Sequence, residues 1–349
     1  MLFAMVYSLK DFDYSLPKEK IAKYPPRVRG KAKLLVIDRK SGKFEDKNYE
    51  DFIDYLNPGD VVVLNKTKVI KSRIFAKKES GKDIEIFFQK ELGEKNGNFI
   101  FEALIGGRVG KEKKLKFQDK FFEIIKKVET SLFKVSFSGN KKEFFNLLDK
   151  FGKVPIPKYL ERKVEKVDEK RYQTVFGKIN GSIASPTASL NITKKTLERL
   201  EEKDVVISFV NLDIGWDTFK PVTEEKIDEH KIHSETFFID EKASNEINSA
   251  KISGKKILAV GTTVMRVLES VSDESGLVKP FSGKTSIFIY PPYRFKVANM
   301  MITNFHAPKT TVIMMVSAFC GKDLLFRAYE HALKNDYKFL SYGDSMLII

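Results

Sequence analysis

Hydrophobic and polar positions change their spacing twice along this chain, and each change predicts a different architecture. Within residues 1–60, residues 33–38 read as a strand and residues 46–56 as a helix that stops at Asn57-Pro58-Gly59. Between residues 60 and 137, short apolar or alternating runs recur about every ten residues, separated by Gly, Asn, Lys and Asp. These runs are residues 61–64, 69–76, 84–88, 99–105, 115–117, 121–128 and 132–137. This spacing is typical of a small antiparallel β-barrel or sandwich.

After the barrel pattern, longer helical segments alternate with strand segments. Residues 143–151 read as a helix that leads into a Pro-rich turn at residues 154–157. Helices are then indicated at residues 193–203, 243–249, 263–270 and 323–335, and strands at residues 205–210, 256–260 and 286–289. This alternation favours a layered α/β domain. We therefore predict a multidomain α+β and α/β chain: residues 1–60 plus 151–349 form a discontinuous layered α/β domain, and residues 61–150 form an inserted small antiparallel β-barrel.

Composition limits the class of protein. The chain has 349 residues, of which 42% are hydrophobic, enough for two cores. Its single cysteine excludes a disulfide framework and a cysteine-rich zinc site, which fits a reducing compartment. No basic leader and no apolar segment of about 20 residues is evident, so we expect a soluble cytoplasmic protein without a membrane partner.

Positive charge is in excess and unevenly distributed. The chain carries 62 Lys and Arg against 47 Asp and Glu, a net charge of +15. Residues 61–150 hold 21 basic and 12 acidic residues, so this quarter of the chain supplies +9 of the excess. A polyanion partner is the natural interpretation. The alternative is the ion-pair-rich surface of a protein from a hot environment, which explains many charges better than it explains an excess of one sign.

Candidate chemistry is concentrated in a few polar stretches next to apolar runs. They are residues 172–188, 230–235, 260–270, 303–311 and 341–346. The chain has four histidines, and the imidazole is suited to proton transfer near neutral pH. His306 is framed by Asn304 and Lys309, although a histidine that is only hydrogen-bonded to backbone remains an alternative. His230 and His233 could hold a metal if Glu235 joined them, but nothing else in the chain completes a zinc site.

Shorter motifs extend from one end of the chain to the other. They include Asp11-Phe12, Leu16-Pro17, Tyr24-Pro25, Gly59-Asp60, V-P-I-P-K-Y at residues 154–159 and Y-E-H-A at residues 329–332. Each motif alone is weak. In this order, and together with the polar stretches, they resemble the S-adenosylmethionine:tRNA ribosyltransferase-isomerases of queuosine biosynthesis across nearly the whole chain.

The resemblance implies an activity and its partners. Such an enzyme transfers and isomerises the ribose of S-adenosylmethionine onto the aminomethyl group of 7-aminomethyl-7-deazaguanine in a tRNA anticodon. The products are epoxyqueuosine-tRNA, adenine and methionine. The reaction needs a base beside the sulfonium, a hydrogen bond to the leaving adenine and a clamp for the methionine carboxylate. The resemblance implies no metal and no permanently bound cofactor, S-adenosylmethionine as co-substrate and a two-domain arrangement. We expect a monomer, because no segment looks like an obligatory oligomer surface.

Site residues are carried over to the matching positions. The candidates for proton transfer are His306, His233, Glu235 and Asp213. The candidates for binding S-adenosylmethionine are Thr262, Thr263, Arg266, Tyr172, Gln173, Thr187 and Asn304. The candidates for RNA contact are Lys66, Lys68, Arg73, Arg294, Lys296 and Lys309.

The residues themselves leave some of these roles open. Gly261-Thr262-Thr263 follows a short strand and opens a helix, where backbone N–H groups and hydroxyls could hold a carboxylate that Arg266 pairs with. An ordinary helix cap with Arg266 facing solvent is the alternative. For Tyr172 and Gln173, which we expect near adenine or the modified base, a plain β-hairpin is the alternative.

Two departures from the family pattern concern histidines. Asn191 and Asp213 stand where the family usually has His, the second within residues 212–219, where the usual pattern is L-H-V-G-x-G-T-F. Asp213 can still accept a proton, whereas Asn191 cannot. A tRNA-binding homologue that has lost the chemistry is therefore the alternative function. A methyltransferase is disfavoured because the glycine-rich turn after a first strand is absent.

Overall fold

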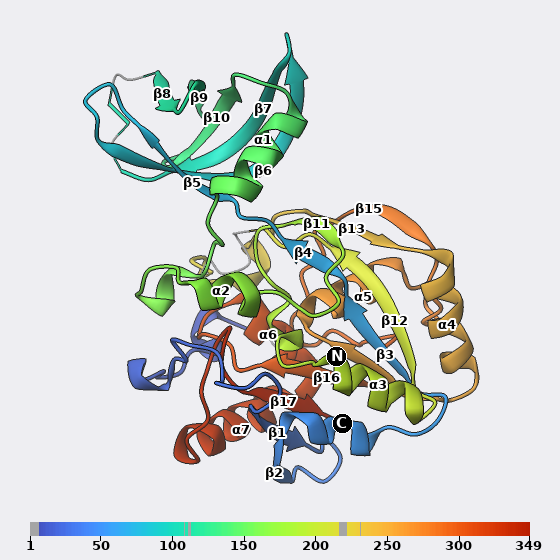
Figure 1. Cartoon of the computed structure of the whole chain (residues 1–349). Helices are drawn as coiled ribbons and strands as arrows, with labels where there is room; N and C mark the ends of the chain where they lie inside the picture. Colours follow the sequence, from blue (N-terminus) through green and yellow to red (C-terminus); the bar gives the residue numbers. More distant parts are fainter. Residues whose placement is uncertain (1–6, 108, 111–112, 216–221, 231) are drawn as a thin grey trace. The chain divides into compact units, whose positions relative to one another are not determined.

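A computed structural model describes residues 7–107, 109–110, 113–215, 222–230 and 232–349, and Figure 1 traces the chain. Residues 216–219 of the L-H-V-G-x-G-T-F match lie outside these described residues. The chain divides into two compact units. The larger comprises Met1–Lys68, Pro157–Arg162 and Arg171–Ile349, and the smaller comprises Val69–Ile156 and Lys163–Lys170. None of the helices among the described residues is long and apolar enough to cross a membrane.

A nine-stranded sheet forms the centre of the larger unit. Its strand order is β15-β13-β12-β3-β14-β16-β17-β1-β2. The bounds are Phe281–Thr285 (β15), Glu235–Ile239 (β13), Val206–Leu212 (β12), Val61–Asn65 (β3), Ile257–Val260 (β14), Met300–Asn304 (β16), Ser345–Ile348 (β17), Lys33–Ile37 (β1) and Phe44–Asn48 (β2). The four central strands β12, β3, β14 and β16 run parallel, so their carboxyl ends meet at one edge. A two-stranded sheet of β4 (Thr67–Val69) and β11 (Ile179–Ser182) is separate.

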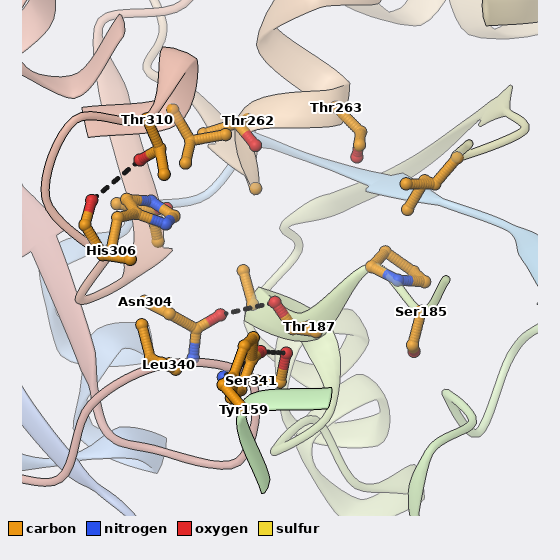
Figure 2. A pocket seen from close by; sticks show the side chains of 17 residues that line it. Tyr159, Ser185, Thr187, Thr262, Thr263, Asn304, His306, Thr310, Leu340 and Ser341 are labelled. Carbon is orange, nitrogen blue, oxygen red and sulfur yellow. Dashed lines mark hydrogen bonds between the residues drawn. The ribbon is translucent and has the colours of Figure 1, made fainter. Parts of the chain in front are cut away.

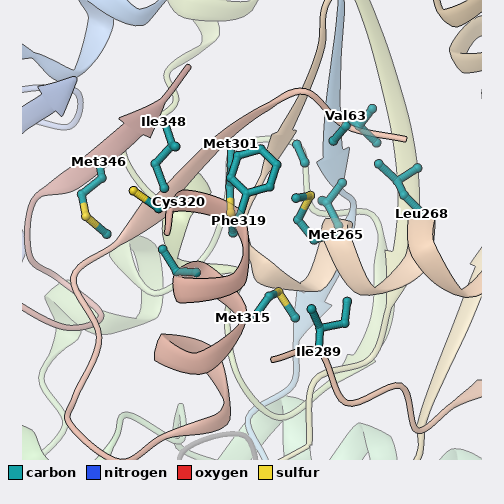
Figure 3. Packing of buried hydrophobic residues seen from close by; sticks show 14 of the residues in the cluster. Val63, Met265, Leu268, Ile289, Met301, Met315, Phe319, Cys320, Met346 and Ile348 are labelled. Atoms are coloured by element: carbon teal, nitrogen blue, oxygen red, sulfur yellow. The ribbon is translucent and has the colours of Figure 1, made fainter. Parts of the chain in front are cut away.

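Hydrophobic side chains cover both faces of the central strands. Val61 and Val63 of β3 belong to one core cluster, and Val62 and Leu64 belong to another. Because side chains alternate across a strand, the two clusters occupy opposite faces of the sheet. The first includes residues of α4 (Glu241–Ile252), α5 (Thr262–Val271), α6 (Thr311–Cys320) and α7 (Lys322–Lys334), and Figure 3 shows part of it. The second includes residues of the 3₁₀ helix η3 (Tyr49–Tyr55) and of α3 (Lys194–Glu202).

The smaller unit is a closed six-stranded antiparallel barrel of order β10-β7-β6-β5-β8-β9. Its strands are Arg73–Lys77 (β5), Asp83–Lys95 (β6), Asn98–Ile105 (β7), Lys114–Phe117 (β8), Lys120–Lys127 (β9) and Leu132–Phe137 (β10). Helix α1 (Lys141–Phe151), capped by Asn140, inserts Phe144 among the buried rings of Phe99, Phe101 and Phe122. Helix α2 spans Lys166–Arg171.

The layered α/β unit and the antiparallel barrel are thus confirmed, with corrections at particular elements. The strand predicted at residues 61–64 was assigned to the barrel, but it is β3, at the centre of the large sheet. Its full burial requires covering on both faces, which is typical of a strand in a parallel sheet. No strand forms at residues 286–289, because the sheet strand ends at Thr285. The helix predicted at residues 46–56 begins as strand β2 and continues as η3.

Candidate functional site

A cavity of about 100 Å³ lies in the larger unit, where the chain leaves the central strands. Its wall contains residues that follow β12, β14 and β16, and segments that are distant in sequence complete it. The carboxyl edge of parallel strands is the usual place for a ligand site in α/β proteins. The lining residues are Tyr159, Ser185, Pro186, Thr187, Ala188, Ile214, Gly261, Thr262, Thr263, Thr303, Asn304, His306, Ala307, Thr310, Val312, Leu340 and Ser341 (Figure 2).

The wall is rich in hydroxyl groups. It carries no Asp, Glu, Lys or Arg among the described residues. Ser185 is 2% exposed, and its Oγ has no hydrogen-bond partner in the part of the chain that the structure describes. A buried hydroxyl without a partner is unusual in a folded protein and marks a position where a bound ligand can supply one.

Helix α5 begins at this wall. Gly261 precedes it with φ 100°, a left-handed conformation that favours glycine, and this turn brings Thr262 and Thr263 to the cavity. No side chain caps this end of the helix. The first backbone N–H groups of a helix attract anions, so this end can receive a carboxylate. Behind it, buried Asn65 donates from Nδ2 to Thr263 Oγ1 at 3.3 Å and to the Leu212 carbonyl at 3.0 Å, which ties α5 to the neighbouring strand ends.

His306 is the histidine of this wall. Its backbone is fixed on both sides: Tyr14 OH donates to the His306 carbonyl, and His306 N–H donates to Tyr329 OH at 2.9 Å. Its ring Nε2 is hydrogen-bonded to Thr303 Oγ1 at 2.8 Å. Burial lowers the pKa of His306 to about 3, because the surroundings disfavour a charged imidazolium. The ring is therefore neutral at physiological pH.

Two further polar pairs hold the opposite segments of the wall together. Thr187 Oγ1 donates to Asn304 Oδ1 at 2.9 Å. The hydroxyl of Tyr159 bonds to Ser341 Oγ and also accepts from the Ser341 backbone N–H at 3.3 Å. Burial raises the pKa of Tyr159 to about 12, so it stays a neutral hydrogen-bonding group. Figure 2 shows both pairs at the hollow.

Glu235 and Arg266 do not line this cavity. The Arg266 Nη1 pairs with Glu235 Oε2, and both side chains are 7% exposed. Gly215 N–H also donates to Glu235 Oε1 at 2.9 Å. The guanidinium expected to clamp a ligand carboxylate is therefore engaged by a carboxylate of the protein. The alternative of a solvent-facing Arg266 is wrong, because the residue is buried.

Asp213 also lies outside the cavity wall. Its carboxylate accepts hydrogen bonds from Thr67 Oγ1 at 2.9 Å and from Asn211 Nδ2 at 3.1 Å. Burial raises its pKa above the usual range of an aspartate, and the negative charge of Glu235 adds to this. Asn191, at the other position where the family usually has His, is buried at 3% exposure and does not line the cavity either.

The remaining ligand candidates lie apart. Tyr172 is fully buried with its ring against Tyr342, and the Gln173 carbonyl accepts from Arg29 at 2.9 Å. Neither residue lines the cavity. His233 is exposed. His230 bonds through Nδ1 to Glu224 at 2.6 Å. Within the described residues, no cluster of His, Cys, Asp or Glu has a geometry that could hold a metal ion.

The RNA candidates are mostly engaged. Ion pairs join Lys66 to Asp240, Arg73 to Glu85, Lys296 to Glu274 and Lys309 to Asp13. Lys68 and Arg294 are exposed. Lys68 and Arg294 are thus open to solvent, and a role in RNA contact stays a prediction for all six residues.

Sequence reasoning placed Thr187, Thr262, Thr263, Asn304 and His306 at a site, and the structure brings these five together. It assigned no site role to Tyr159, Thr303, Thr310 or Ser341, which also line the cavity. The available signal was their position inside the motifs that carry the family resemblance.

Comparisons with known proteins agree on one family. A family model described as "Queuosine biosynthesis protein" matches residues 9–348. An S-adenosylmethionine:tRNA ribosyltransferase-isomerase of Sulfurihydrogenibium sp. is 44% identical over 346 residues, covering 98% of this chain and 99% of the relative. One from Halothermothrix orenii is 42% identical over 348 residues, covering 98% and 99%. The crystal structure of an S-adenosylmethionine tRNA ribosyltransferase from Thermotoga maritima matches with a TM-score of 0.56 and 30% identity, covering 97% of this chain and 100% of that one.

Proposed function

The chain belongs to the queuosine biosynthesis protein family, and from this premise we propose that it is an S-adenosylmethionine:tRNA ribosyltransferase-isomerase. Its reaction moves the ribosyl group of S-adenosylmethionine to the aminomethyl group of 7-aminomethyl-7-deazaguanine in a tRNA anticodon. Isomerisation of the sugar gives epoxyqueuosine-tRNA, and adenine and methionine leave. We expect the protein to act in the cytoplasm as a monomer, with S-adenosylmethionine as a consumed co-substrate.

The observation that supports this function best is the cavity at the carboxyl edge of the sheet. It combines a neutral imidazole, an uncapped helix start and a buried hydroxyl without a partner. A sulfonium amino acid needs a place for its carboxylate, and the start of α5 with Thr262 offers one. Ser185 supplies a further hydroxyl at the same wall.

We propose His306 as the group that handles the proton beside the sulfonium. Of the four candidates for proton transfer, it is the one that lines the cavity. A neutral imidazole has one ring nitrogen without a proton, and Thr303 fixes the orientation of the ring. Glu235, held by Arg266, and Asp213, held by Thr67 and Asn211, then support the neighbouring loops.

Asn304 and Thr187 are proposed to hold the leaving base. The Thr187 hydroxyl occupies Asn304 Oδ1, and Asn304 Nδ2 makes only a long contact of 3.4 Å with the Asp344 carbonyl. This amide can therefore donate to a ring nitrogen of adenine as negative charge develops there. None of these roles requires a histidine at position 191 or 213.

Adenine release tests the proposal. Purified protein is mixed with S-adenosylmethionine and tRNA that carries 7-aminomethyl-7-deazaguanine, and free adenine is measured by chromatography. The same tRNA with an unmodified guanine is the control. Release with the modified tRNA alone supports the function. Binding of tRNA without adenine release would instead favour a homologue that has lost the chemistry.

His306→Asn tests the assignment of the site. This variant keeps one hydrogen-bonding group but removes the basic ring. It should bind S-adenosylmethionine and lose at least 100-fold in adenine release, because general acid–base groups contribute about 10²–10⁴-fold. The exposed His233 provides the matched control, since His233→Asn should retain activity. Full activity in His306→Asn would exclude His306 from the proton transfer.

A further inference from the structure

Three adjacent strands of the barrel expose a face that combines lysines with an aromatic ring. β5, β8 and β9 alternate between buried and exposed side chains. The strand register places Lys77 opposite Lys116, and Lys116 opposite Phe121. Because side chains of paired residues lie on the same face of a sheet, these three residues form a row across the outside of the barrel. Lys114 lies two residues from Lys116 on the same face, and we call the four residues the barrel strip.

Few acidic side chains neutralise the lysines of the barrel strip. Within the part of the chain that the structure describes, Lys114 and Lys116 make no ion pair, and both side chains are exposed. Lys77 pairs with Asp83 at 3.0 Å, but a pair this exposed contributes little. Glu123, opposite Lys114 in the register, is a carboxylate on this face. The sequence ranges of the smaller unit contain 23 Lys and Arg against 15 Asp and Glu, so the surrounding field is also positive.

Phe121 gives the barrel strip a second property. Its side chain is 43% exposed, and no aromatic ring of the described residues packs against it. By contrast, its neighbour Phe122 is fully buried in the barrel core. An exposed ring between lysines matches the chemistry of single-stranded nucleic acid, in which bases stack on aromatic rings and phosphates meet ammonium groups. A protein interface is a poorer match, because lysine is depleted in such interfaces.

We propose that the barrel strip binds an unpaired segment of the substrate tRNA, with a base stacked on Phe121 and phosphates held by Lys114 and Lys116. The segment must be unpaired because the bases of an RNA duplex are stacked on one another and cannot reach a side-chain ring. This inference rests on the proposed function for the identity of its partner. According to this inference, the excess positive charge of the barrel serves to bind the substrate tRNA and takes no part in the catalytic reaction.

The test uses the full chain and measures the Kd for tRNA at several salt concentrations. Phe121→Ala should raise the Kd about tenfold through the loss of one stacked base. Phe121→Tyr keeps a ring and should bind within about twofold of the unchanged protein. Lys114→Ala/Lys116→Ala should raise the Kd at low salt and reduce the slope of log K against log salt by about 1.4, since each phosphate contact on a single strand contributes about 0.7.

The control variant removes two lysine charges from a surface outside the barrel. Lys194 and Lys195 are exposed lysines of α3 in the larger unit, and Lys194→Ala/Lys195→Ala should leave both the Kd and the salt slope nearly unchanged. Thermal melts verify that each variant is folded. If Phe121→Ala binds tRNA as the control does, the stacking assignment is overturned. If the Lys114→Ala/Lys116→Ala variant also binds as the control does, the barrel strip is not an RNA surface.

Adenine release separates this inference from the proposed function. The barrel-strip variants should raise the KM for tRNA and leave kcat unchanged, because none of the four residues lines the cavity. A wild-type protein that binds tRNA through the strip but releases no adenine would refute the proposed function alone. Equal KM values in all variants, with active enzyme, would refute the inference alone.

Discussion

The buried pair of Arg266 and Glu235 gives a prediction that separates a structural role from a ligand-binding role. Both side chains are more than nine-tenths buried, and Arg266 also reaches the Thr285 carbonyl at 3.5 Å. Arg266→Met removes the cation and leaves the Glu235 carboxylate in a buried site without its charged partner. We therefore expect Arg266→Met to destabilise the larger unit rather than to act only on substrate binding.

The magnitude follows from the burial. Removing one partner of a buried ion pair costs about 3–5 kcal/mol, a large part of the 5–15 kcal/mol that stabilises a typical domain. For a unit of this size, each kcal/mol lowers the Tm by about 2–4 °C, so the expected decrease is about 6–20 °C. Replacing both groups, in Arg266→Met/Glu235→Met, removes the unpaired charge and should recover most of the loss.

Urea denaturation followed by far-UV circular dichroism is the assay, since α3, α4, α5, α6 and α7 all belong to the larger unit. Lys242→Met is the matched control, since the Lys242 side chain is 85% exposed and the loss of its pair with Glu246 should change stability by less than about 1 kcal/mol. An Arg266→Met variant with wild-type stability and no affinity for S-adenosylmethionine would refute the reasoning, because Arg266 would then act as a ligand contact.

Other predictions concern single positions. The pKa of His306 is about 3 in the folded chain and about 6.5 in the unfolded chain, so only the unfolded chain takes up this proton as the pH falls from 7 to 5. The free energy of unfolding should therefore fall by about 2 kcal/mol over this range. An equally steep decline in the His306→Asn variant would contradict this prediction. For the same reason, kcat should show no loss from His306 protonation down to pH 5, whereas a tenfold fall with a midpoint near 6.5 would contradict it. Asn65→Ala leaves buried partners of its amide unpaired and should cost about 1–3 kcal/mol by urea denaturation; a neutral result would mean that the bridge to Thr263 contributes nothing. Phe144→Ala empties the centre of the barrel and should cost about 3–5 kcal/mol by circular-dichroism melting, against less than about 1 kcal/mol for the exposed Phe151→Ala.

Local pattern was enough to predict the kind of structure and several members of the site. Closely spaced alternating runs predicted the barrel, and helix–strand alternation predicted the layered unit. His306 and Asn304 were found because a polar stretch next to an apolar run matches a family motif, and Thr262 because it follows a predicted strand and opens a predicted helix. The boundary at β3 was missed, because a short apolar run reads alike in a barrel and in a parallel sheet.

The sequence by itself determined the family, the two architectures and the positive charge, since each of these is carried by motif order, spacing or composition along the chain. The tertiary structure alone decided which groups meet. Arg266 finds Glu235, 31 positions away, and Tyr159 finds Ser341, 182 positions away, because strand order and helix packing bring distant segments to one place. Periodicity reports which face of an element is buried, but not against which partner. The role of an ionisable side chain depends on that partner, and so it emerges only once the chain has folded.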